Sequence, residues 1–325
     1  MGFEESLGDP RDRDTPEADL RALATSQDPI VRLHIAHNPS TPGDVLAMLA
    51  MQDGFEIDEF EEDWEPIDYE EDPYFGDDLN WRICDLHDVI ARNPHTPADV
   101  LENLYFNGSS RSAVSSNPRL PDAVVRKIWA TGDVENMHNI IDLNTSLSDA
   151  FMIEVASSPD FWIGDDSIKS ALASREDCPL LVLELLLRQD PGPHDRDVKA
   201  ALARRESLPL NMLLELAEHD EPMVRGAVVW NPSTPPNLLA QLASDPSEDV
   251  RFRVAMNDAT GSDLLTQLAK DSNDSVRRGV AQNSSTLPHL LTQLAGDVVK
   301  DVREAVAANP STPSEVRAKL EGEDS

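Results

Sequence analysis

The sequence is poor in the residues that build disulfide frameworks and membrane spans. Only two of its 325 residues are cysteines, Cys84 and Cys178, and they lie too far apart for a disulfide framework or a CxxC motif. No apolar run approaches the roughly 20 residues that a membrane-spanning helix needs. Residues 1–5 have neither the basic nor the apolar region of a signal peptide. These absences predict a protein of the reducing cytoplasm with no membrane contact.

Basic residues are also scarce. The chain has 27 Lys and Arg against 61 Asp and Glu, a formal net charge of −34. Residues 1–110 alone hold 27 acids and 6 bases. Such a surface repels nucleic-acid phosphates and anionic lipid head groups, so we expect no direct binding of nucleic acids or membranes. It favours basic protein partners or divalent cations.

Motifs of catalysis and metal binding are missing as well. The sequence has no G-x-S-x-G, P-loop or G-x-G-x-x-G pattern, and none of its acidic stretches has the spacing of an EF-hand. His34 and His37 are three residues apart, a spacing that can bind a metal, but no HExxH motif or third ligand accompanies them. We therefore predict no enzymatic activity, no cofactor and no metal site.

What the chain does contain is an internal repeat. The stretch Asn231-Pro-Ser-Thr-Pro, followed by an apolar segment that ends at Ala243, has near-copies that begin at Asn38, Asn93 and Asn309. From Arg205 onward each step is 26 residues, and a longer first step of 55 residues contains an insertion. Alignment on the Asn gives ten repeats with key positions Asn38, Asn93, Asn117, Asn144, Arg175, Arg205, Asn231, Asn257, Asn283 and Asn309.

Each repeat is predicted to form two short helices. Val224–Val229 and Val302–Ala307 place apolar residues at i, i+3 and i+4, the pattern of a helix with one buried stripe. The Asn-Pro pair ends this first helix, because proline excludes the preceding residue from the α region. Thr41, Thr96 and Thr312 are candidate N-caps of the second helix, with the proline that follows at its first position.

One such helix pair cannot bury its apolar stripes alone, whereas stacked pairs can. The predicted fold class is therefore all-α, an α-solenoid of about ten two-helix repeats of about 26 residues each. We read the less regular middle repeats, around Asn144, Arg175 and Arg205, as degenerate copies. The predicted organisation is a loose N-terminal lead-in over 1–19, a first repeat over 20–51, an acidic aromatic insertion over 52–80, the remaining repeats over 81–320 and a tail over 321–325.

The repeat pattern Val-Arg-x-x-Val-Ala-x-Asn-Pro-x-Thr-Pro-x-x-Leu-Leu-x-x-Leu-Ala resembles the leucine-rich repeat variant (LRV) family. It is carried by Val250–Asn257 and Val276–Ala295, and the match covers residues 22–50 and 83–320. The resemblance implies a right-handed superhelix in which α-helices alternate with 3₁₀-helices. The period of the family is about 24 residues, so the longer period here can extend the second elements into α-helices, as in HEAT-like arrays. Some members bind an iron–sulfur centre through a cysteine cluster that this chain lacks, so we transfer no cofactor.

Two ladders of polar side chains follow the repeat. The Asn ladder could be a polar ridge that binds a ligand, but Asn also satisfies backbone groups in tight turns, and we favour this structural role. The Arg ladder could bind an anion or a phosphate chain. The alternative that we favour is pairing with acids of adjacent repeats such as Asp249, Asp274 or Asp301. The Arg ladder comprises Arg32, Arg225, Arg251, Arg277 and Arg303.

The insertion is the most distinctive segment. Residues 53–78 contain fourteen acids and no Lys or Arg. A solvated linker needs acids but no aromatics, whereas acids with aromatics suit a segment that docks onto a basic or apolar groove of a protein partner. The alternatives are a disordered loop and a loop that packs against the solenoid. The aromatics that could bind the partner are Phe55, Phe60, Trp64, Tyr69, Tyr74, Phe75 and Trp81.

Taken together, these patterns predict a repeat scaffold without enzymatic activity that binds a protein partner through an extended surface and the acidic insertion. A second interpretation is a mimic of nucleic acid, whose acidic face occludes a DNA- or RNA-binding partner. A third, from another class, is an enzyme with its site in the degenerate middle repeats, near Asp165, Asp166 and Cys178. The sequence does not fix the oligomeric state.

Overall fold

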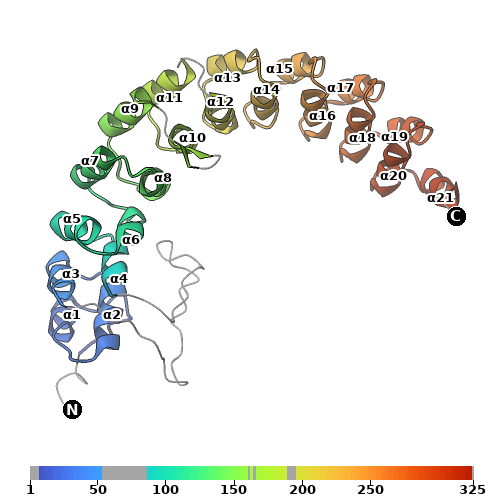
Figure 1. Cartoon of the computed structure of the whole chain (residues 1–325). Helices are drawn as coiled ribbons and strands as arrows, with labels where there is room; N and C mark the ends of the chain where they lie inside the picture. Colours follow the sequence, from blue (N-terminus) through green and yellow to red (C-terminus); the bar gives the residue numbers. More distant parts are fainter. Residues whose placement is uncertain (1–6, 53–85, 160–161, 164–165, 189–194, 324–325) are drawn as a thin grey trace. The chain divides into compact units, whose positions relative to one another are not determined.

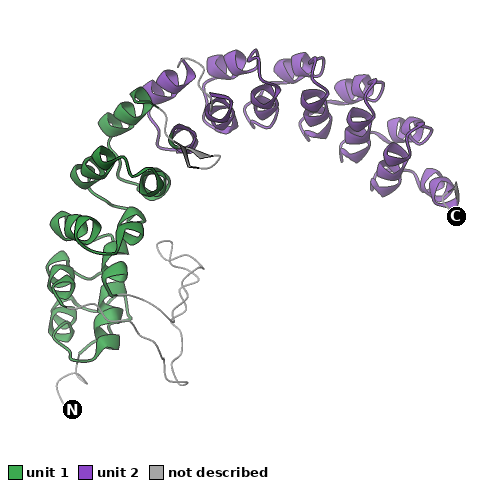
Figure 2. Ribbon diagram, viewed as in Figure 1, with its two compact units in different colours: residues 1–168 green, residues 169–325 purple. Residues whose placement is uncertain are grey.

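The structure is a computed structural model, and it describes residues 7–52, 86–159, 162–163, 166–188 and 195–323. The chain divides into two compact units, unit 1 over residues 1–168 and unit 2 over residues 169–325 (Figure 2). Within each unit the helices alternate between two rows, the first and second helices of successive repeats (Figure 1). The predicted α-solenoid is confirmed.

The described part of unit 1 contains nine helices and one hairpin. The helices are α1 (Glu17–Leu23), α2 (Pro29–His37), α3 (Gly43–Ala50), α4 (Leu86–Arg92), α5 (Ala98–Phe106), α6 (Arg111–Ser115), α7 (Asp122–Thr131), α8 (Val134–Leu143) and α9 (Asp149–Ser157). The antiparallel strands β1 (Trp162–Ile163) and β2 (Asp166–Ser167) form the hairpin. The sequence analysis did not predict this hairpin, and it is the one departure from an all-α fold among the described residues.

Unit 2 contains six helix pairs in its described part. They are α10 (Ile168–Ser174) with α11 (Leu180–Leu187), α12 (Asp195–Arg204) with α13 (Leu210–Leu216), α14 (Pro222–Val229) with α15 (Pro236–Leu242), α16 (Glu248–Met256) with α17 (Ser262–Leu268), α18 (Asp274–Gln282) with α19 (Pro288–Leu294), and α20 (Lys300–Ala308) with α21 (Ser314–Glu323). The unit boundary falls at the first residue of α10. Both helices of each pair are α-helices, so the second elements are not 3₁₀-helices where the structure describes them.

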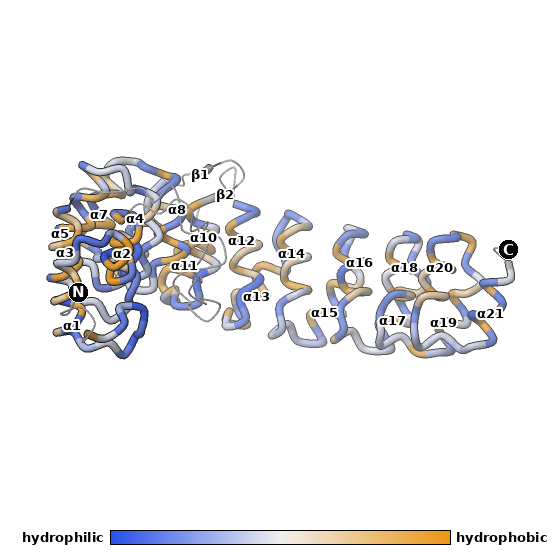
Figure 3. The backbone as a smooth tube through the Cα atoms, turned by 90° about the horizontal axis from the view of Figure 1, so that it is seen from below, coloured by the Kyte–Doolittle hydropathy of each residue, from blue (hydrophilic) through white to orange (hydrophobic). Residues whose placement is uncertain are grey.

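Packing follows the order of the chain. In unit 2 the first helices contact one another in chain order, from α12 through α14, α16 and α18 to α20. In unit 1 the same holds from α2 through α4 and α6 to α8. Most second helices also pack on the first helices beside them, as α15 does on α14 and α16. Val224 and Val228 of α14 and Leu238 and Leu242 of α15 are almost fully buried. Apolar and polar stretches therefore alternate along every repeat of unit 2 (Figure 3).

The predicted role of the threonines as N-caps is wrong. The second helix begins one residue later than expected, so that the proline after the threonine is the N-cap, as at Pro42 and Pro97. The threonine hydroxyl instead donates a hydrogen bond backwards to the end of the first helix: Thr234 Oγ1 lies 2.6 Å from the carbonyl oxygen of Val228. The hydroxyl thus satisfies one of the carbonyl groups that a helix leaves open at its C-terminus.

Within each unit the Asn ladder links successive repeats. The amide of Asn283 donates to the carbonyl oxygens of Ala255 (2.8 Å) and Asn257 (3.0 Å) in the preceding repeat, and its Oδ1 accepts from the backbone N–H of Ser285 (2.8 Å). The side chain is 2% exposed, so these bonds leave it nothing to offer a ligand. Asn144 donates instead to the carbonyl oxygen of Leu120 (2.8 Å). The same contacts as at Asn283, in whole or in part, are made by Asn38, Asn93, Asn117, Asn231, Asn257 and Asn309.

One degenerate repeat keeps this link with another residue. Arg205 stands where other repeats have Asn, is 4% exposed, and donates from Nη1 to the carbonyl oxygens of Ala173, at 2.8 Å, and of Arg175. These two acceptors are equivalent to those of Asn283, so a guanidinium group replaces the amide. The repeat of Arg205 is thus joined to the one before it, within unit 2, as the regular repeats are.

The N-terminal segment is folded from residue 7 onward. Helix α1 begins at Glu17, inside the stretch 1–19 that was predicted to be a loose lead-in. The amide of Asn38 donates to the carbonyl oxygens of Pro10 (2.9 Å) and Asp12 (2.8 Å). The segment therefore takes the place of a preceding repeat and supplies the acceptors that the first Asn of the ladder needs.

We expect the substitution Asn283→Ala to destabilise unit 2 by about 2–3 kcal/mol, because three backbone groups, one buried and two partly buried, lose their partner at about 1 kcal/mol each. Urea unfolding followed by circular dichroism measures this loss. Ser284→Ala is the matched control, since the neighbouring hydroxyl makes only a 3.4 Å contact with an exposed Asp258 oxygen. Equal midpoints for the two variants would contradict the role given to the amide.

Candidate functional site

The predicted partner-binding aromatics, from Phe55 to Trp81, lie outside the described residues, which resume at Leu86. The binding role of the insertion therefore stays a prediction. The structure instead directs attention to three features of the described chain: the Arg ladder, a charged cluster that replaces it in one repeat, and an apolar pocket in unit 1.

The Arg ladder forms ion pairs between repeats. Arg225 holds the carboxylate of Asp245 with two hydrogen bonds, from Nε (2.7 Å) and Nη2 (2.8 Å), while its Nη1 donates to the carbonyl oxygens of His219 (2.7 Å) and Asp220 (2.8 Å). The pairs Arg251–Asp271 and Arg277–Asp297 repeat this arrangement. Pairing with acids was predicted, but Asp249, Asp274 and Asp301 were the wrong acids. The aspartate that each arginine binds lies 20 residues further along the chain.

These pairs leave no room for a phosphate on their guanidinium groups. The side chains of Arg277 and Asp297 are 14% and 8% exposed. The hydrogen bonds from Arg277 lower the pKa of Asp297 below its ordinary value, and they outweigh burial, which acts in the opposite direction. Asp297 also accepts from the backbone N–H of Val299 (2.9 Å), so one carboxylate fixes both the arginine and the turn that leads into α20.

One repeat replaces this pair by a different cluster. Lys199 stands at the position of Arg225 and His219 at the position of Asp245, each 26 residues earlier. Both contact the carboxylate of Asp195: Lys199 Nζ lies 3.0 Å from Oδ1 and His219 Nε2 lies 3.2 Å from Oδ2. Asp195 lies within α12 itself. It thus supplies the negative charge that comes, in the next repeat, from Asp245 just after the second helix.

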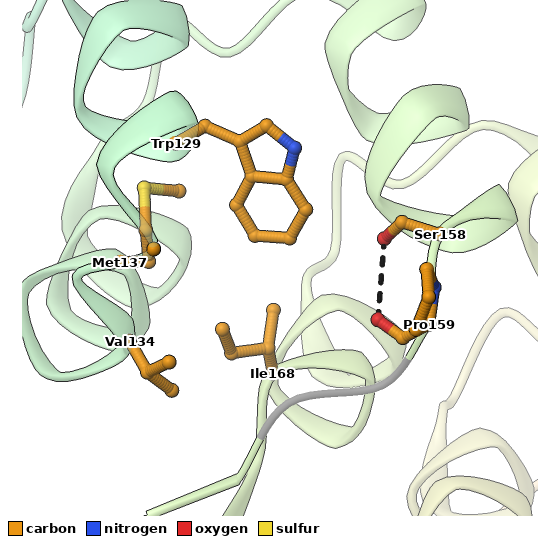
Figure 4. Close-up of a pocket in the computed structure, with 7 residues that line it drawn as sticks. Trp129, Val134, Met137, Ser158, Pro159 and Ile168 are labelled. Atoms are coloured by element: carbon orange, nitrogen blue, oxygen red, sulfur yellow. Dashed lines mark hydrogen bonds between the residues drawn. The ribbon is translucent and has the colours of Figure 1, made fainter.

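An apolar pocket of about 220 Å³ opens in unit 1. Its walls are Trp129 from α7, Val134 and Met137 from α8, and Ile168, and its rim is closed by Gly132, Ser158 and Pro159. Figure 4 shows the indole ring of Trp129 above Ile168. Val134 and Met137 lie on one side of the pocket, and Ser158 and Pro159 lie on the other. Almost all of this lining is hydrocarbon, and the ring of Trp129 is held by an edge-to-face contact with Phe151 at 6.1 Å between ring centres.

Two local features beside the pocket depart from the regular repeat. Ten residues separate α9 from α10 in the sequence, whereas five suffice between α15 and α16. Gly132, which lines the pocket, ends α7 with a φ of 71°, a left-handed conformation that favours glycine.

The sequence analysis did not find this pocket, although a signal was present. Trp129 stands twelve residues after Asn117. The equivalent position is alanine in six other repeats, namely Ala50, Ala156, Ala217, Ala243, Ala269 and Ala295. A large aromatic residue at a position that the fold fills with a methyl group marks an irregular site.

The other predicted candidates do not assemble into a reactive centre within the described residues. His37 is 2% exposed, and its burial, together with the nearby His34 and Arg92, lowers its pKa to about 3. Cys178 is buried. The described residues contain no group of three His, Cys, Asp or Glu side chains placed to hold a metal ion. The placement of Asp165 falls outside them.

Comparisons with known proteins find similar chains among the solved structures. No family model and no curated protein matches the sequence. A solved structure described as "a leucine-rich repeat variant with a novel repetitive protein structural motif" is similar to this chain, with 22% sequence identity and a TM-score of 0.41. The alignment covers 73% of this chain and 84% of that chain. No helix among the described residues is long and apolar enough to cross a membrane.

The ion-pair ladder predicts an acid-sensitive unit 2. The pKa of Asp297 is lower in the folded protein, so its contribution to stability is present at neutral pH and is lost as the pH falls through that lowered value. We expect Asp297→Asn to lower the free energy of unfolding by about 1–3 kcal/mol at pH 7, and the difference from wild type to shrink below about pH 4. Urea midpoints between pH 7 and pH 3 measure this. Asp258→Asn serves as the exposed control, and a difference that is independent of pH would refute the assignment.

Proposed function

We propose that this protein is a repeat scaffold that binds a protein partner, and that the pocket at Trp129 takes an apolar anchor side chain of that partner. The observation that carries the proposal is an apolar hollow on a surface with a large excess of acids. Protein interfaces concentrate their binding energy where a few large side chains fill desolvated pockets. The pocket volume suits one large aliphatic or aromatic side chain.

The chemistry of the lining favours binding over catalysis. The polar groups at its rim are already engaged: the hydroxyl of Ser158 donates to the carbonyl oxygen of Val155 at 2.7 Å, and Asp133, next to Gly132, accepts a 2.6 Å bond from Tyr105. Apolar surface therefore remains to meet a ligand. The net charge of −34 indicates that the sequence around the anchor in the partner is basic.

The acidic insertion supports the same role from the sequence. Its fourteen acids and its aromatics could dock onto a basic or apolar groove while the pocket receives the anchor. A mimic of nucleic acid is the second candidate, favoured by the charge of the insertion alone. The two candidates differ in salt dependence, because a mimic relies on charge and loses affinity steeply as salt rises.

The pocket can be tested by two opposite changes. Trp129→Ala introduces the residue of six other repeats and removes one wall, whereas Val134→Trp fills the space. After a partner has been identified by affinity purification of the full chain from its native cell, we expect either variant to weaken its binding at least tenfold in calorimetry, about 1.4 kcal/mol. Leu287→Ser, which changes an exposed leucine of unit 2, is the control. Unchanged affinity in both pocket variants would refute the anchor role.

Deletion of residues 53–78 tests the insertion. The deleted segment interrupts the regular repeat, so we expect the helix content by circular dichroism to be retained while binding of the identified partner is lost. The same titration with competing duplex DNA and at rising salt separates the candidates. Displacement by DNA with a steep salt dependence would favour the mimic, and full binding by the deletion variant would exclude the insertion from recognition.

A further inference from the structure

Two second helices of unit 2 expose leucines that the fold does not require. Leu180, Leu181 and Leu210 are each 52% exposed, and Leu214 is 42% exposed. Leu180 and Leu181 begin α11, while Leu210 and Leu214 lie on α13. The two helices are neighbours in the row of second helices in both Figure 1 and Figure 3. We call these four side chains the leucine patch.

The other repeats show that the leucines have no role in folding. Leu180 and Leu210 occupy the first position of their helices, five residues after Arg175 and Arg205. The eight other repeats place small, polar or proline residues there and fold in the same way. These equivalent residues are Gly43, Ala98, Asp122, Asp149, Pro236, Ser262, Pro288 and Ser314. Leu180 and Leu210 hold the same repeat position on neighbouring helices, and exposed apolar residues arranged in this way mark sites of interaction, so the leucine patch indicates a docking surface.

The charges beside the patch define the partner. Glu184 lies one turn after Leu180 on α11, and Glu215 and Glu218 follow Leu214 at the end of α13. Residues 180–188 and 210–218 contain one basic residue, Arg188. The surface is therefore a leucine stripe with an acidic border. A second copy of this chain would bring acids against acids, so charge disfavours self-association and favours a basic partner.

We propose that the leucine patch binds a basic amphipathic α-helix of a partner protein. Apolar residues at i, i+3, i+4 and i+7 of such a helix would cover the four leucines, and lysines or arginines beside them would face the acidic border. The inference rests on the proposed role as a binding scaffold, but it uses a surface in unit 2, separate from the pocket at Trp129. It names the chemical class of the partner, which the pocket alone does not.

The test uses a synthetic peptide of about 18 residues, five helical turns, with leucines on one face and lysines on the other. Its binding to the full chain is measured by fluorescence anisotropy at about 0.15 M salt, where exposed charges are screened beyond about 8 Å. The variant carries Leu180→Ser, Leu181→Asp, Leu210→Ser and Leu214→Thr, the residues that α17 has at these positions. We expect the affinity to fall at least tenfold, although the variant gains a negative charge.

Three controls separate the patch from general attraction and from the pocket. Leu287→Ser removes an exposed leucine outside the patch and should change the affinity less than twofold. Trp129→Ala should also leave peptide binding unchanged, so that failure of the pocket and failure of the patch are distinguishable. A peptide with serines in place of leucines measures the attraction due to charge alone and should bind at least tenfold more weakly.

Three results would overturn the proposal. The four-leucine variant, checked for native helix content by circular dichroism, could bind the peptide as tightly as wild type. A peptide with glutamates in place of lysines could bind equally well, which would remove the charge argument. Sedimentation could show a wild-type dimer that the four-leucine variant abolishes, which would assign the patch to self-association.

Discussion

The side-chain amide of the ladder asparagine is the interaction on which each unit depends. It bonds three backbone groups at once, two carbonyls of the preceding repeat and one N–H of its own turn, as at Asn283. Aspartate could not donate these bonds, and glutamine would hold the same amide one methylene further from its turn. Because these donors and acceptors lie at the ends of the first helices, they fix how successive repeats of one unit meet. The apolar side chains then pack between helices whose spacing the amide hydrogen bonds have fixed.

The ion-pair ladder adds a second link, between a first helix and the end of the next second helix. Arg225, Arg251 and Arg277 each join a carboxylate 20 residues ahead. These three guanidinium groups are thereby paired within unit 2, and the carboxylates that they bind are largely shielded from water. The acids that make the net charge −34 are mostly not part of this ladder. The protein therefore presents negative charge outward, and the proposal of a basic partner rests on this excess.

The sequence was sufficient for the features that depend on the repeat and insufficient for those that depend on local geometry. Asn-Pro pairs and the apolar spacing predicted the helices, their pairing and their stacking. The role of the threonines was missed because a hydroxyl can donate as well as accept, and the Thr234 hydroxyl donates to Val228. The acids that pair with arginine were chosen near the next first helix, whereas stacking brings Asp245 to Arg225. The pocket is lined by Trp129 and Gly132, and no periodic pattern predicts such departures from the repeat.

Departures from the consensus fall into two kinds, and the difference bears on function. Arg205 replaces an asparagine and bonds the same two carbonyls, and Tyr105 replaces an alanine but is buried and bonded to Asp133. These changes are compensated within the fold. Trp129 packs against Phe151 but also lines the open pocket, and the leucines of α11 and α13 are exposed where most other repeats have small or polar residues. Apolar surface left in water is costly, and this cost is the reason for the proposal that a partner covers these side chains.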